Sequence, residues 1–486
     1  MSRPEDVRVR LVEAELTERT VRLRLPFRFG VTTMTEARQA VLRVRIARAD
    51  GGGAVGIAAE CLLPKWFDKN PQLTDADNVE QLRTALAIAL DLYRHAGTDT
   101  PFGLSARVYP QQQASCRVVG LNPLVASYGP ALIDRAILDA VGRMLGLSFA
   151  EMITANVPGL AVTELTPDLA GFDLPGFLAG LAPADSIAVR HTVGLVDALD
   201  AGDLDAAAPD DGLPRTLAEV VRAYGCRYFK IKVSGDPAAD LDRLQGIAAV
   251  LDGSAGDYRS TLDGNEQYGD VEGIAELWRR IDEHPALKRL AASVLCIEQP
   301  IKRAVALERD VRALSMLKPM MIDESDGDLD AFPRAVGLGY QGVSSKTCKG
   351  FYKSILNAAR VARRNAEGGG GRYFVSAEDL CTWAGICTQQ DIALVSLLGL
   401  THLERNGHHY IDGMSFAPDD EQDHFVAKHP DLYHRAPGKP ARLTIRDGQL
   451  AIGSLNCPGF AVGVIPDDRK LLLQDLDAPC RRAESS

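Results

Sequence analysis

The region from residue 186 to residue 412 limits the possible folds most, because short apolar runs alternate there with amphipathic segments. Strand–helix repetition of this kind predicts parallel strands joined by crossover helices. Each unit is only about 25–35 residues long and many follow in series, which favours a closed (β/α)7β barrel of the TIM type over an open sheet. The predicted strands lie in the runs SIAVRHTVG, CRYFKIKV, YRSTLDGN, SVLCIEQP, KPMMIDES, YQGVSSKTCKG and RYFVSAED.

Residues 1–150 have a different pattern and are expected to form a separate α+β domain. Residues 7–61 contain runs typical of strands, two of them joined by a glycine-rich turn at Gly51–Gly53. Helical periodicity follows over 77–96 and 127–148. The order of strands followed by helices predicts a sheet covered by helices.

Three further segments complete the domain organisation. A polar, glycine-containing stretch near 27–34 is expected to be a mobile loop between the first strands. Residues 151–185 are expected to link the first domain to the barrel. In the C-terminal segment, 413–486, the polar and proline-rich stretch 413–445 predicts long loops, and ARLTIRDGQLAIG predicts a hairpin that turns at Asp447–Gly448.

The composition excludes several classes of function. The chain has 486 residues, a net charge of −11 and a pI near 5.4, so it lacks the basic surface that nucleic acids or anionic membranes require. The sequence contains no run of about eighteen apolar residues, which is the length needed to span a bilayer. The charged first residues do not form a secretory signal, and nine cysteines without CxxC pairs indicate reduced thiols in a cytoplasmic protein.

Three acidic residues follow apolar strand-like runs at intervals of one βα unit: Asp263, Glu298 and Asp323. The carboxyl ends of successive barrel strands meet at one face, so these side chains are expected around one point. A single acid at a strand end could instead cap the next helix, but three adjacent carboxylates need a cation to stay ionised. Hard oxygen ligands without His or Cys favour Mg²⁺, with Mn²⁺ as the alternative.

Two lysines, Lys230 and Lys232, lie in the run FKIKV. Residues i and i+2 of a strand share a face, so both lysines are expected to face the barrel interior while Phe229 and Ile231 pack on the helices. The alternative is a solvent-exposed edge strand. Burial and mutual repulsion would lower the pKa of such lysines, which makes a lysine a usable base near neutral pH.

A further lysine, Lys346 in GVSSKTCKG, is expected at the end of the next strand after Asp323, across the barrel from Lys232. Lys349 is the alternative by register. Metal ligation of a substrate carboxylate would offset the charge of the enediolate that forms when the adjacent carbon loses a proton. With one lysine on each face, that intermediate could be reprotonated on the other side or could expel a β-substituent.

Other polar residues are candidates for supporting roles. Asn265 and Glu324 sit beside the predicted ligands and are expected to orient carboxylates or lysines by hydrogen bonds. His191 could line the mouth of the first barrel strand or could be a packed, hydrogen-bonded histidine. His402, His408 and His409 surround ERNG near the expected eighth strand, where they could contact substrate or lie on a surface loop.

The motifs resemble those of the enolase superfamily, and within it the muconate-lactonising-enzyme-like subgroup of the mandelate racemase and muconate lactonising enzyme family. LDGN, IEQP and IDES resemble the metal-ligand motifs, FKIKV the Lys-x-Lys motif, and VSSKTCKG the lysine-bearing sixth strand. Sites of this superfamily use a lysine or histidine base with Mg²⁺. The resemblance implies Lys232 as the base, Lys230 as its partner and Lys346 as the second catalytic lysine.

The resemblance also assigns roles outside the barrel. It implies that the first domain caps the barrel, that the C-terminal segment completes this cap, and that the loop near 27–34 closes over substrate. Phe29 and Thr32 are therefore candidate substrate contacts. Glu378, in VSAED, matches a seventh-strand position where the subgroup often has an acid. Relatives commonly assemble as homo-oligomers, and the same is expected here.

The expected activity is 1,1-proton transfer, by a racemase or epimerase acting on a small carboxylate or amino acid derivative. The alternatives are syn-elimination of water, as in acid-sugar dehydratases or succinylbenzoate synthase, and cycloisomerisation. A non-catalytic binding protein on the same fold is a more remote alternative. The chain is longer than a typical member around 62–75, 100–124 and 413–440, and these segments could reshape the site entrance.

Overall fold

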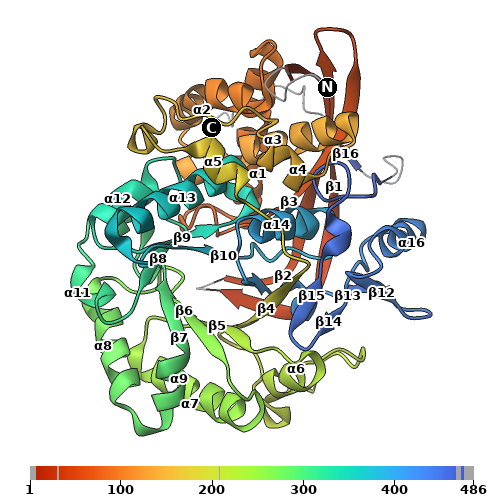
Figure 1. Cartoon of the computed structure of the whole chain (residues 1–486). Coiled ribbons are helices and arrows are strands. Elements are labelled where there is room, and N and C mark those ends of the chain that lie inside the picture. The colour runs from red at the N-terminus through yellow and green to blue at the C-terminus, as the bar shows by residue number, and fades with distance from the viewer. Residues whose placement is uncertain (1–6, 30–31, 207, 467–471, 475–486) are drawn as a thin grey trace, which may run out of the picture.

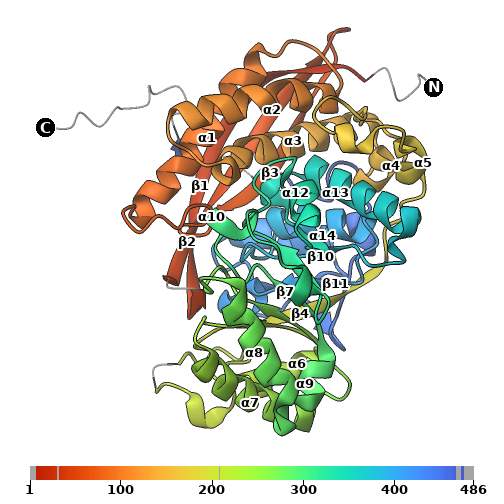
Figure 2. The same cartoon turned by 90° about the vertical axis from the view of Figure 1, so that its left-hand side faces the viewer.

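The computed structural model describes residues 7–29, 32–206, 208–466 and 472–474. An N-terminal domain lies on one side of a parallel barrel, and its long strands extend along the barrel (Figures 1 and 2). Its antiparallel sheet has the strand order β16-β1-β2-β3. The strands are β1 (Val9–Phe29), β2 (Thr32–Arg48), β3 (Gly53–Leu62) and β16 (Leu472–Gln474). No helix in these described ranges is long and apolar enough to cross a membrane.

The segment near 27–34 differs from the predicted loop. Strand β1 continues to Phe29 and pairs there with Thr32, at the start of β2. The stretch is therefore mostly a β-hairpin end, and residues 30–31 of the expected loop lie outside the described residues. The prediction of a loop gave too little weight to the alternation of polar residues with Phe27, Phe29 and Met34, which are buried and mark a strand.

Three helices cover the sheet of the cap: α1 (Asp75–His95), α2 (Pro101–Val118) and α3 (Pro123–Leu145). Each begins at a capping side chain, Thr74, Thr100 or Asn122, which accepts a backbone N–H of the first turn. Helix α3 packs closely on β3, because a Cβ at Gly56 would lie 2.1 Å from the carbonyl oxygen of Ala136. The segment 100–124 is thus mainly a helix of the cap.

The segment 151–185 runs from helix α4 (Phe149–Thr154) to the first barrel strand, and it contains a short helix, α5 (Leu174–Ala179). The ring of Phe149 stacks on Phe460 from the C-terminal segment, with ring centroids 3.9 Å apart.

Eight parallel strands form the barrel, and pairing of β11 with β4 closes it. This confirms the predicted (β/α)7β barrel. The strands are β4 (Ser186–Val193), β5 (Tyr228–Lys232), β6 (Arg259–Asp263), β7 (Val294–Glu298), β8 (Met320–Ile322), β9 (Gly342–Ser345), β10 (Phe374–Ala377) and β11 (His402–Arg405). The crossover helices are α6 (Leu217–Tyr224), α7 (Pro237–Ser254), α8 (Val271–Glu283), α9 (Lys288–Ser293), α10 (Arg303–Ala306), α11 (Arg312–Ser315), α12 (Ala331–Gly337), α13 (Phe351–Arg364) and α14 (Ile386–Leu397).

The C-terminal segment divides between the two domains. Strand β15 (Gln449–Ala451), which pairs with β14 (Ile445–Arg446), adds to the barrel beside β4, whereas β16 pairs with β1 of the cap. Strand β16 of the C-terminal segment thus returns to the cap, as predicted, whereas the hairpin of β14 and β15 joins the barrel. The prediction of long loops over 413–445 is wrong in part. Helix α15 (Gly407–Tyr410) precedes them, and they contain α16 (Asp419–Lys428), β12 (Tyr433–Arg435) and β13 (Ala441–Leu443).

Candidate active site

Strand register brings the predicted catalytic and metal-binding residues together at the carboxyl end of the barrel. Lys232 on β5 pairs with Asp263 on β6, which pairs with Glu298 on β7. Asp323 follows β8 and Lys346 follows β9. All five side chains are buried, so the strands hold a compact cluster of charged groups out of contact with solvent.

Lys230 is the centre of this cluster. Its ammonium group donates to Glu298 at 2.8 Å, to Glu378 at 2.8 Å and to Glu404 at 2.9 Å, and it lies 2.9 Å from Asp263. Burial opposes the charge, but these four carboxylates raise the pKa of Lys230 well above its ordinary value. The expectation of a lowered pKa is therefore wrong for Lys230, because opposite charges surround it.

The other two predicted catalytic lysines each bind a different predicted metal ligand. Lys232 Nζ donates to Asp263 Oδ2 at 2.6 Å, and Lys346 Nζ donates to Asp323 Oδ2 at 2.6 Å. Burial opposes the charge of Lys346, but Asp323 outweighs it and raises the pKa of that lysine. The Lys346 ammonium also lies 4.3 Å from the ring centroid of Trp66, within the range of a cation–π contact.

Lys349, the alternative to Lys346, points to the back of the cluster. Its Nζ donates to Ser344 Oγ and lies 3.0 Å from Asp326 and 3.4 Å from Asp323 Oδ1. Burial opposes ionisation, but Lys346 and Lys349 hold the pKa of Asp323 well below its usual range. The two lysines thus bracket the Asp323 carboxylate, Lys346 from the side of Trp66 and Lys349 from the side of Ser344.

The three predicted metal ligands offer oxygen donors but are engaged with lysines. Across the described ranges, no three acidic, His or Cys side chains stand ready to hold a metal ion. The donor set nevertheless fits a hard divalent cation, because Asp263 and Glu298 adjoin in register. In addition, Glu324 Oε2 and Asn265 Oδ1 are buried without a hydrogen-bond partner among the described residues. Burial and the neighbouring charges of Asp263 and Glu378 raise the pKa of Glu298, a cost that a bound cation would relieve.

Asn265 and Glu324 lie beside the ligands as expected. Asn265 has a positive φ of 41°, which turns the chain after β6 so that its N–H donates to Asp263 Oδ1 at 2.8 Å. Its side-chain amide donates to Glu324 Oε1 at 3.2 Å. Gln299 has a similar role that the sequence did not indicate, since its side-chain oxygen accepts the N–H groups of Asp323 and Ser325.

The additional segment 62–75 covers the cluster. Trp66 and Phe67 are buried, and their carbonyl oxygens accept from the guanidinium of Arg303 at 2.7 and 2.8 Å. Arg303 also pairs with Glu266, which binds Lys69 from the same segment at 2.7 Å. These contacts fix Trp66 over Lys346.

The remaining predicted site residues separate into two groups. Glu378 contacts Lys230, and Phe29 lines the small cavity above the lysines, together with Phe27 and Trp66. Thr32 does not line this cavity. His191 lies away from the site, because its ring nitrogen is 3.2 Å from that of His408, and burial lowers its pKa to about 3.

Two residues of this charged network, Glu404 and Arg190, were not predicted, although the strand pattern of the sequence indicates both. Glu404 lies near the end of β11, in the same position as the strand-end acids already recognised, and accepts from Lys230 and from Thr192. Arg190 is fully buried and pairs with Glu378. The alternation that faces Lys230 inward also faces Arg190 inward and His191 outward.

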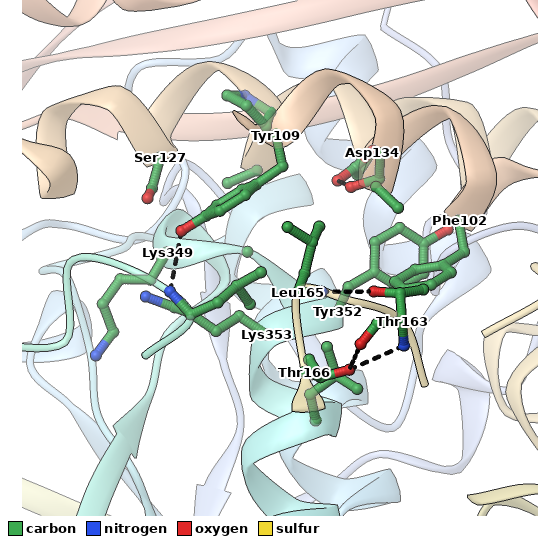
Figure 3. A pocket seen from close by; sticks show the side chains of 17 residues that line it. Phe102, Tyr109, Ser127, Asp134, Thr163, Leu165, Thr166, Lys349, Tyr352 and Lys353 are labelled. Atoms are coloured by element: carbon green, nitrogen blue, oxygen red, sulfur yellow. Dashed lines mark hydrogen bonds between the residues drawn. The ribbon is translucent and has the colours of Figure 1, made fainter. Parts of the chain in front are cut away.

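The cavity above the lysines has a volume of about 20 Å³, which is room for about one water molecule. A second, narrow cavity of about 50 Å³ lies behind Lys349, between the cap helices and α13 (Figure 3). Asp134 and Tyr109 point into it from the cap, and Lys353 points into it from α13. Burial raises the pKa of Asp134 to about 7, while Tyr93 and Ser105 donate to its carboxylate.

Comparison with solved structures shows which fold this is. No protein-family model and no curated protein matches the sequence. A muconate lactonizing enzyme from Mycobacterium smegmatis complexed with muconolactone matches with a TM-score of 0.57 at 20% identity, over 96% of this chain and 100% of that one. A member of the enolase superfamily from Roseovarius nubinhibens complexed with magnesium matches with a TM-score of 0.55 at 18% identity, over 95% and 97%.

An enolase from an alpha proteobacterium with bound magnesium also matches, with a TM-score of 0.57 at 15% identity, over 96% of this chain and 97% of that one. These matches cover both the cap and the barrel. They confirm the resemblance at the level of the fold: the chain shares the capped-barrel fold of these solved structures.

Proposed function

We propose that this protein is an enzyme of the enolase superfamily that removes a proton from the carbon beside a carboxylate. The observation that carries the proposal is the pair of buried lysines, Lys232 and Lys346, each hydrogen-bonded to a different strand-end aspartate, Asp263 or Asp323. A buried ammonium–carboxylate cluster is costly to assemble, and groups held in this way are typical of catalytic centres.

Asp263, Glu298 and Asp323 would hold the divalent cation, Mg²⁺ with Mn²⁺ as the alternative. When bound, the cation would take up carboxylate charge that now binds the lysines, and it would offset the negative charge of an enediolate. Asn265 and Glu324 would orient these ligands through the hydrogen bond between their side chains.

The protein's own groups would move the proton. Lys232 would accept it from one face of the substrate carbon, and Lys346 would return a proton to the opposite face. Lys230 is tied to four carboxylates, so its role would be to balance their charge rather than to shuttle protons. Phe27, Phe29 and Trp66 would keep bulk water from the intermediate.

We infer 1,1-proton transfer on a small carboxylate or amino acid derivative as the reaction, that is, a racemase or epimerase. Two lysines that reach the site from different strands support this choice, because inversion needs an acid and a base on opposite faces. Cycloisomerisation is the second candidate, since the Mycobacterium smegmatis structure is a muconate lactonizing enzyme complexed with muconolactone. Syn-elimination of water would use the same lysines. Assembly as a homo-oligomer and a cytoplasmic location complete the proposal.

A deuterium-exchange screen tests the reaction class. The protein is incubated in D₂O with Mg²⁺ and a panel of small carboxylates, N-acylated amino acids and dipeptides, and each is followed by proton NMR. Exchange at the α-carbon with loss of optical purity is expected for the true substrate. Exchange accompanied by loss of water would contradict racemisation and favour elimination. No Mg²⁺-dependent exchange with any α-carboxylate would contradict the reaction class.

A further inference from the structure

The opposite end of the barrel contains a larger cavity, of about 410 Å³. It lies at the amino ends of the strands, because its lining includes Pro319 before β8, Gln341 before β9 and Thr401 before β11. Its volume is within the range of sites that hold small molecules, about 300–1,000 Å³. This cavity is separate from the small space above the catalytic lysines, and the two share no lining residue among the described parts of the chain.

Several residues that line this lower cavity carry buried polar atoms without partners in the described structure. Arg190 Nε, Thr261 Oγ1 and His402 Nδ1 are buried atoms that lack a hydrogen-bond partner within the described ranges. The side chains of Arg190 and Thr261 are almost completely buried, at 0% and 1% exposure. A buried donor left without a partner is unfavourable, so these groups are candidates for hydrogen bonds with a ligand that enters the cavity.

The charge of the lining selects the ligand. Arg190 at the inner end and Arg372 at the mouth are cationic, and no carboxylate is among the described residues that line the cavity. A guanidinium and a hydroxyl group are good donors for oxyanions. We propose that the lower end of the barrel binds a small oxyanion, a carboxylate or a phosphate, through Arg190 and Thr261.

Arg190 connects this site to the catalytic end. Its guanidinium pairs with Glu378 and donates to the carbonyl oxygen of Ala377 at 2.6 Å, and Glu378 in turn accepts from Lys230. An anion on one side of this chain and a divalent cation on the other would attract each other across the barrel interior, where charges are weakly screened. Each ligand therefore tightens the binding of the other, by linkage.

Calorimetric titration of the metal-free protein tests the proposal. Succinate and inorganic phosphate are used as separate probes at constant ionic strength, so that the two arms distinguish a carboxylate from a phosphate ligand. We expect saturable binding of one anion per chain for at least one probe. Saturating Mg²⁺ is expected to lower the Kd of that anion at least two-fold. Absence of saturable binding by both probes overturns the site, and an unchanged Kd with Mg²⁺ overturns the link through Arg190.

Two variants locate the binding. Thr261→Val keeps the shape of the side chain but removes the hydroxyl donor, and it is expected to weaken anion binding five-fold or more. Arg279→Met, at an exposed position on α8, is expected to leave the Kd within two-fold of the original. Thermal melting confirms that both variants fold. Full-strength binding in Thr261→Val, or its loss in Arg279→Met, would place the anion elsewhere and contradict the proposal.

Discussion

The two ends of the barrel differ in how their polar groups are satisfied. At the carboxyl end, Lys230, Lys232 and Lys346 each bind carboxylates within 2.9 Å, and only about 20 Å³ of space is left above them. At the amino end, Arg190 Nε and Thr261 Oγ1 have no partner in the described structure, and their residues are among those that line a cavity of about 410 Å³. The barrel interior therefore has a closed carboxyl end, where charges are paired, and an open amino end, where some polar atoms lack hydrogen-bond partners.

The difference shows what burial alone does and what pairing adds. Burial disfavours every charge, but opposite charges hold the pKa of Asp263 below its ordinary value and raise that of Lys230. Asp134 is equally buried but has only neutral donors, and its pKa rises to about 7. Ion pairing at the carboxyl end of the barrel keeps its acidic and basic side chains ionised and in fixed positions, which catalysis by proton transfer requires.

The largest effect is expected from removing either catalytic lysine. Lys232→Ala and Lys346→Ala are each expected to reduce turnover by about 10³-fold or more, because general acid–base groups contribute about 10²–10⁴-fold. The measurement is α-carbon exchange and inversion on the substrate found in D₂O. Lys318→Ala is the control, since that lysine lies over Trp278 outside the cluster. Full activity in Lys346→Ala would show that the two-base interpretation is wrong.

Breaking the connection between the ends should cost stability. Arg190→Met leaves Glu378 buried with one cation fewer, and it is expected to lower the free energy of unfolding by about 3–5 kcal/mol. Denaturant unfolding measures this loss. The control is Arg279→Met on α8, whose side chain is 53% exposed and whose ion pairs are screened by solvent, so that little stability should be lost. Equal losses in the two variants would contradict the role of buried pairing.

Opening the closed end is expected to have a moderate effect. Trp66→Ala removes the ring over the Lys346 ammonium, a contact of about 0.5–2 kcal/mol, and it exposes the lysines to water. Turnover should fall about ten-fold while the melting temperature changes little more than in Trp278→Ala, which removes the comparable ring over Lys318. If both variants retain the same activity, Trp66 only fills space.

The smallest effect concerns Asp134, the buried acid without a cation. Its pKa is raised to about 7, so the folded state binds more protons than the unfolded state between pH 4 and 7. Stability should therefore fall as pH rises through this range, by at most about 1.4 kcal/mol per pH unit from this group. Asp134→Asn is expected to remove that slope in unfolding measured at several pH values. A slope identical to that of the original protein would assign it to other groups.

Much of the fold and of the site followed from local sequence patterns. The βα repetition predicted the barrel, and the endings LDGN, IEQP and IDES marked where successive strands stop. The i, i+2 spacing of Lys230 and Lys232 predicted two inward-facing lysines. These patterns can be recognised in the sequence because strand alternation and crossover spacing depend on residues that are close together in the chain.

Other features depended on contacts between distant segments. Trp66 covers Lys346 because Arg303, which is itself paired with Glu266, holds the Trp66 backbone, and nothing within residues 62–75 indicates these partners. Burial opposes the charge of Lys230, but four carboxylates from different strand ends converge on it and raise its pKa: Asp263, Glu298, Glu378 and Glu404. The sequence by itself determined which groups face the barrel interior. Only the tertiary structure decided which charges meet there, because electrostatic interactions depend on distances that chain closure sets.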